Sequence, residues 1–167
     1  LWERTATALP AASDLPPYEE LYLSFLASRQ VHLSAQSWRQ MQEQLMRTDI
    51  SQCMTLPWQE WQRQNLLNLA FYRLALNCYQ EHQQPEQQRK LLAYQSYLRD
   101  GILRSGNGKA SFSAWRISTF ADAHELLGLL GMQMQDYHAV LGSSGNSMHY
   151  EVHAYDPADN QLKVIFF

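Results

Sequence analysis

The sequence predicts an α+β fold, with an N-terminal bundle of about four helices followed by a small antiparallel sheet. All seven glycines lie between Gly101 and Gly145. The preceding part of the chain is punctuated by proline alone, which favours long helices. After about residue 110 the apolar pattern changes from a helical period to an alternation of two. We therefore expect a strand, a helix and a three-stranded meander in the second part.

Three segments are expected within one compact unit of 167 residues. Residues 1–17 carry alanine, threonine, serine and three prolines, a composition that predicts an irregular leader left by a removed signal peptide. A helical subdomain follows over residues 18–104, and an α+β subdomain over residues 105–167. We accordingly expect export to the periplasm or cell envelope, and leave open a lipid tether at the N-terminus.

Proline marks the expected helix starts. Its fixed φ suits the first helical turn, and the backbone N–H that it lacks would have no partner within the helix there. Pro16 and Pro17 precede the first helix, which begins at Tyr18. The other helices are expected at Ser34–Arg47, from Thr55 and Pro57 to about His82, and from Pro85 to Leu103. If the third helix is continuous, Cys53 and Cys78 stand roughly 30 Å apart. We therefore expect two free, mostly buried thiols.

The second part has its own start and stop signals. A short strand is expected over Phe112–Ser118, and Thr119 with Asp122 then caps a helix that ends at Gly131. The meander strands are expected at Met132–Leu141, Met148–Tyr155 and Leu162–Phe167, with a turn at Gly142–Asn146.

The charge balance argues against nucleic-acid binding. Thirteen basic and sixteen acidic side chains give a net charge of −3, whereas nucleic-acid-binding domains carry a basic footprint. No apolar run approaches the ~20 residues of a membrane span. Glutamine instead fills much of the polar surface, in clusters around residues 40–44, 59–64 and 83–88.

The stretch Ser105-Gly106-Asn107-Gly108-Lys109 resembles a motif of a bacterial family known as domain of unknown function 4919. The resemblance extends through Ala114–Ile117, Leu129–Gly131, Tyr150–Val152 and Tyr155–Pro157, and is best over residues 86–167. Asn107 stands where the family pattern has aspartate. The resemblance implies an exported module of helices and sheet, with no catalytic residues to transfer.

The same glycine-rich stretch does not fit a phosphate loop. Such a loop follows a strand, opens a helix and has serine or threonine directly after its lysine. Here a helix precedes and Ala110 follows Lys109. We expect a tight turn in which the glycines adopt positive φ.

His149, Glu151 and His153 share one face of an expected strand. With His138 on the neighbouring strand they have the residue types of a zinc site. The favoured interpretation is a solvated polar face, with Tyr150, Val152 and Ala154 directed inward. We predict no metal site, no cofactor and no catalytic residues, since Cys53, Cys78, Ser143, Ser144 and Ser147 lack the sequence context of a nucleophile.

A cluster of aromatic side chains allows two interpretations, a core or a strip that binds peptide or glycan. The core is favoured because aromatic residues at helical spacing are usually buried. The cluster comprises Trp58, Trp61, Phe71, Tyr72 and Tyr79.

The function expected from these features is non-enzymatic binding of another protein. The most concrete form is an immunity protein that occludes a secreted antibacterial toxin. Its expected contact residues are Ser143, Ser144, Asn146, His149, Glu151 and His153. One alternative is an envelope scaffold or assembly protein with a helical peptide-binding groove. Another is a metal-dependent hydrolase that uses the strand carrying His149, Glu151 and His153, which we call the histidine strand.

Overall fold

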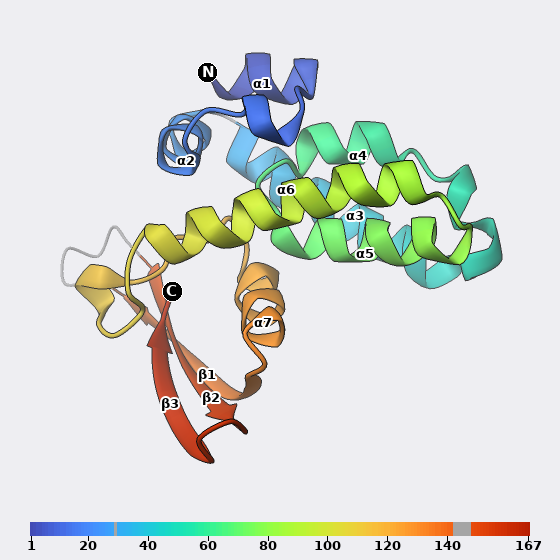
Figure 1. Cartoon of the computed structure of the whole chain (residues 1–167). Coiled ribbons are helices and arrows are strands. Elements are labelled where there is room, and N and C mark those ends of the chain that lie inside the picture. The colour runs from blue at the N-terminus through green and yellow to red at the C-terminus, as the bar shows by residue number, and fades with distance from the viewer. Residues whose placement is uncertain (29, 142–147) are drawn as a thin grey trace. The chain divides into compact units, whose positions relative to one another are not determined.

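The computed structural model describes residues 1–28, 30–141 and 148–167. It has the expected α+β fold, and its strands form the expected C-terminal meander (Figure 1). The chain divides into two compact units, Leu1–Leu98 and Arg99–Phe167. Within the described residues, no helix is both long enough and apolar enough to cross a bilayer.

The first unit consists of helices. In chain order they are α1 (Trp2–Ala8), the 3₁₀-helix η1 (Ala12–Asp14), α2 (Tyr18–Leu26), α3 (Gln30–Arg47), the 3₁₀-helix η2 (Ile50–Thr55), α4 (Trp58–Gln64), α5 (Leu69–Glu81) and α6 (Pro85–Arg104), whose last residues belong to the second unit. The prolines have the expected positions, because Pro17 and Pro57 are the N-cap residues of α2 and α4.

The expectation of an irregular leader over residues 1–17 is wrong for its first part. Trp2, Thr5 and Ala6 form the buried face of α1. The Trp2 ring packs on Phe25 with centroids 4.7 Å apart, and the Trp2 backbone N–H donates to Ser24 Oγ at 2.9 Å. These contacts with α2 stabilise a helix whose composition alone did not predict it.

The expected long third helix is in fact two helices, α4 and α5. Asn65 turns its side-chain amide onto the Trp61 carbonyl at 2.9 Å. Asn68 then caps α5 by accepting from the Phe71 N–H at 3.0 Å. Asparagine competes for backbone partners in this way and favours helix ends over helix interiors. The chain therefore changes direction between residues 65 and 68.

This turn brings the two cysteines together. Cys53 and Cys78 form a disulfide, with their Cα atoms 5.9 Å apart. The expectation of free thiols is wrong, because the calculated separation assumed an unbroken helix. The bridge attaches η2 to α5, and both cysteines are buried.

Apolar side chains from every long helix fill the first unit. The side chains of its core include Leu21, Met41, Leu66, Leu69, Tyr72 and Leu98, each 0–1% exposed. Tyr72 and Tyr94 stack across α5 and α6 with ring centroids 5.4 Å apart.

The second unit contains the end of α6, the 3₁₀-helix η3 (Ser111–Ser113), α7 (Phe120–Leu129) and a sheet. The sheet is antiparallel in the order β1 (Gln133–Leu141), β2 (Met148–Asp156) and β3 (Gln161–Phe166). Phe120 of α7 packs on Tyr137 and Tyr150, with centroids 4.3 and 4.6 Å apart, so α7 covers one face of the sheet.

The expected strand over Phe112–Ser118 is absent. Phe112 lies in η3 and is 94% exposed. Trp115 donates its backbone N–H to the Phe166 carbonyl at 3.0 Å, but no ladder continues from this bond. The alternation of apolar residues over this short segment therefore wrongly predicted a strand, because among the described residues only one backbone hydrogen bond to β3 forms there.

The glycine-rich stretch is a turn, as expected, but its two glycines act differently. Gly108 has a φ of 66°, a left-handed conformation. Gly106 has no room for a side chain, because a Cβ atom there would lie 2.4 Å from the carbonyl oxygens of Ser113 and Ala114. The Asn107 side chain accepts from the Lys109 N–H at 2.9 Å and so closes the turn.

Candidate functional site

The histidine strand has the predicted orientation. Val152 and Ala154 of β2 are fully buried beneath α7, whereas His149, Glu151 and His153 lie half-buried on the opposite face. Ser143, Ser144 and Asn146, the other expected contact residues, lie outside the described residues, as does the expected turn over 142–146.

The structure brings two of these side chains into direct contact. His153 Nε2 lies 3.1 Å from Glu151 Oε1. The His138 ring on β1 is next, with its centroid 5.8 Å from that of His153, and its Nε2 lies 3.4 Å from Asp136 Oδ2. The imidazoles of His138 and His153 therefore each have a carboxylate close by.

Among the described residues, a different set has its ligand atoms closest together. Cys53 Sγ, Cys78 Sγ and a nitrogen of His82 all lie within 4.8 Å of one another. The two sulfurs are bonded to each other, so neither is a thiolate that could bind a metal ion. The oxidised form of this set therefore holds the chain together instead of offering ligands.

The aromatic cluster is divided between core and surface. Trp58, Trp61, Phe71 and Tyr72 are buried, as the favoured interpretation predicted. Their rings pack edge to face, as in the Trp58–Trp61 and Phe71–Tyr72 pairs at 5.3 and 5.1 Å. Tyr79 is only half-buried and lies beside Trp58, with ring centroids 6.3 Å apart.

Trp58 and Tyr79 lie at a groove in the first unit with a volume of about 490 Å³. We call this feature the glutamine groove. It is lined by Ala8, Leu9, Met54, Trp58, Gln59, Gln62, Arg63, Phe71, Ala75, Tyr79, Gln84, Gln87, Lys90, Leu91 and Tyr94. Most of these residues come from α4, α5 and α6. Met54 comes from η2, Ala8 and Leu9 from the end of α1 and the residue after it, and Gln84 from the turn before α6.

Aromatic rings and amides give this groove a mixed character. Trp58, Phe71, Tyr79 and Tyr94 contribute apolar ring surface, whereas four glutamines contribute donors and acceptors. Burial raises the pKa of Tyr79 and of Tyr94, so both phenols stay neutral at physiological pH. In the described part of the chain, the Tyr79 hydroxyl makes no hydrogen bond. A ligand could therefore both stack and hydrogen-bond here.

Hydrogen bonds hold two lining residues, Tyr94 through its hydroxyl and Tyr79 through its backbone carbonyl. Tyr94 donates its hydroxyl to the Pro10 carbonyl, which fixes the segment after α1 against α6. Gln88, next to the lining residue Gln87, donates its side-chain amide to the Tyr79 carbonyl at 3.0 Å and ties α6 to α5. The disulfide adds a covalent tie, because Met54 and Tyr79 each directly follow a bridged cysteine. These contacts preform the walls of the groove.

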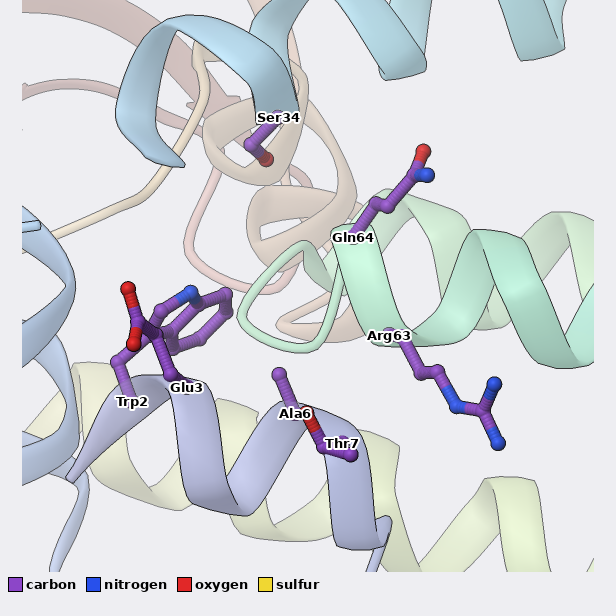
Figure 2. Close-up of a pocket in the computed structure, with 7 residues that line it drawn as sticks. All are labelled: Trp2, Glu3, Ala6, Thr7, Ser34, Arg63 and Gln64. Carbon is purple, nitrogen blue, oxygen red and sulfur yellow. The ribbon is translucent and has the colours of Figure 1, made fainter. Parts of the chain in front are cut away.

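A smaller hollow of about 180 Å³ adjoins it and shares Arg63. Figure 2 shows Trp2 and Ser34 turned toward the space between α1, α3 and α4, whereas the Arg63 guanidinium points away from Trp2. A third hollow, lined by Met54, Leu56 and Glu60 among others, also shares Arg63. Arg63 thus stands where the three hollows meet.

Sequence reasoning placed three aromatic residues of this groove in one cluster but missed its polar walls. The available signal was the pair of glutamine clusters near residues 59–64 and 83–88, which α4 and the start of α6 bring to one site. Arg63 and Lys90 gave no signal of their own, because one or two basic residues occur on most helices.

Comparisons with known proteins identify no relative. No family model matches the chain, and no curated protein or solved structure is detectably similar. The resemblance of residues 86–167 to domain of unknown function 4919 therefore stays a prediction.

Proposed function

We propose that this protein is a non-enzymatic protein-binding module whose glutamine groove holds an extended segment of a partner chain. The observation that supports this is the preformed groove itself, with aromatic surface and glutamine amides on a disulfide-tied helical unit. Tryptophan and tyrosine contribute most to protein interfaces. Preformed walls also lower the conformational entropy that binding would otherwise cost.

The groove favours the scaffold interpretation of the two protein-binding roles. Helical grooves hold peptide segments through apolar anchors flanked by polar contacts. The narrower role of an immunity protein stays a prediction, and so do a toxin partner and an envelope location. A toxin gene beside the gene for this protein would support the immunity role.

Site-specific photocrosslinking tests the proposal in cells that produce the protein. A benzophenone amino acid is placed at Gln87, an exposed lining residue of α6, and in a matched protein at Arg89, which does not line the groove. We expect one partner segment to crosslink from position 87 and not from position 89. Mass spectrometry of the crosslinked peptide then identifies the segment.

A second variant tests whether the crosslinked segment is bound by the aromatic residues of the groove. We expect Tyr79→Ala to weaken binding of the identified segment by at least about tenfold, the loss typical of an aromatic contact residue. Equal crosslinking at positions 87 and 89 would contradict the proposal. Hydrolysis of an ester, peptide or glycan that disappears in His153→Ala would replace it with the hydrolase alternative.

A further inference from the structure

We infer that the glutamine groove selects an acidic segment of its partner, and this rests on the proposed function. Its charged lining residues are both cations, Arg63 of α4 and Lys90 of α6. Among the residues that the structure describes, no aspartate or glutamate lines the groove. The two neighbouring hollows that share Arg63 each contribute one carboxylate, Glu3 and Glu60, and neither of these lines the groove itself.

Both cations are available to a ligand. Within the described ranges, neither the Arg63 nor the Lys90 side chain forms an ion pair or hydrogen bond. Both side chains are exposed. A guanidinium binds a carboxylate through two parallel hydrogen bonds, whereas an ammonium acts as a compact point charge. A segment with two or more carboxylates could therefore engage both helices.

The other lining residues indicate where in the ligand the carboxylates should lie relative to its apolar residue. The aromatic rings of Trp58 and Tyr79 offer an apolar contact, and the glutamine amides can hydrogen-bond a peptide backbone. The fitting ligand is thus an extended peptide with an apolar residue flanked by aspartate or glutamate. The protein's net charge of −3 does not oppose this choice, because charges separated by more than about 10 Å are largely screened in physiological salt.

A display library of random peptides about ten residues long provides the test, with the full-length oxidised protein as bait. We expect the pool selected on the natural sequence to be enriched about twofold or more in aspartate and glutamate. The variant with both Arg63→Gln and Lys90→Gln should still select peptides, but without this enrichment. Arg89→Gln, beside Lys90 and outside the groove, is the matched control and should keep it.

The affinities of synthetic peptide pairs, one peptide with carboxylates and the other with the corresponding amides, measure the charge preference directly. For a selected peptide, replacing each carboxylate with its amide should weaken binding about tenfold at low salt, the effect expected for losing charge-assisted hydrogen bonds. That preference should shrink as sodium chloride rises.

The outcomes separate the two proposals. If acidic and amide peptides bind equally, or basic peptides bind better, the charge selection is wrong while the peptide groove stands. If no peptide is selected, or only a neutral oligosaccharide binds at the groove, both proposals fall.

Discussion

Asp122 Oδ2 lies 2.8 Å from the backbone nitrogen of Thr119, the N-cap residue of α7. The same oxygen also accepts from the backbone N–H and the hydroxyl of Ser118, at 3.0 and 2.8 Å. Asp122 is completely buried. One carboxylate oxygen therefore satisfies three donors at the point where the chain enters the helix that covers the sheet.

We expect Asp122→Ala to lower the free energy of unfolding by about 3 kcal/mol, because it leaves three part-buried donors without their acceptor. Asp122→Asn keeps one side-chain oxygen and should cost clearly less. Chemical denaturation followed by fluorescence measures both. Equal losses in the two variants would show that the hydrogen bonds are not what stabilises this turn.

Two glycines of the α7 region form a matched pair for a second prediction. Gly131 has a φ of 76°, and its N–H donates to the Gly128 carbonyl in the turn that ends the helix. A Cβ atom at either glycine would meet no atom within 4 Å. Gly131→Ala should therefore cost about 1 kcal/mol through backbone strain alone.

Gly128, by contrast, lies within α7, where alanine is the better helix former. Gly128→Ala should raise the free energy of unfolding by about 0.5–1 kcal/mol. Thermal denaturation of the two variants side by side measures the difference, and effects of the same sign would contradict the role assigned to Gly131.

The ion pair between Asp156 and Lys163 predicts a pH dependence. The hydrogen bond from Lys163, at 2.5 Å, lowers the pKa of Asp156 below its ordinary 3.8, with a smaller contribution from the Ala158 N–H. The same bond, with one to Asp159, raises the pKa of Lys163 above 10.5. The stabilisation from Asp156 is present above pH 3.8 and is lost as the pH falls through its lowered pKa.

For Lys163 the sign is reversed, so its stabilisation is present below pH 10.5 and is lost as the pH rises through its raised pKa. Lys163→Gln should therefore flatten the change in melting temperature at both the acid and alkaline extremes. Lys109→Gln, which removes an exposed ammonium in the same unit, should leave the profile unchanged. A Lys163→Gln profile identical to that of the natural protein would refute the assignment.

The parts of the fold that the sequence predicted well are those with local signals. Thr119, Asp122 and Gly131 mark both ends of α7 through their own backbone chemistry. The meander strands also fall within a residue or so of expectation, since alternation over six to nine residues is a strong pattern.

The failures depend on contacts between distant residues. Leu66 and Leu67 continue an apolar pattern through the break between α4 and α5, and only the asparagines on either side marked it. That break determined the cysteine pairing, and the pairing helps to form the groove. One missed turn therefore hid both the disulfide and the site, because no short window of sequence contains both cysteines.

The bridge has a thermodynamic consequence for the proposed ligand. It constrains Met54 and Tyr79 on facing elements of the groove, so reducing it would release the geometry that a bound segment requires. Coupling of this kind is reciprocal. An occupied groove must then stabilise the bridge by the same factor by which the bridge favours occupancy, and a saturating peptide should shift the reduction equilibrium with dithiothreitol toward the oxidised form. The affinity of the groove for its ligand would thereby depend on the redox state of the surroundings.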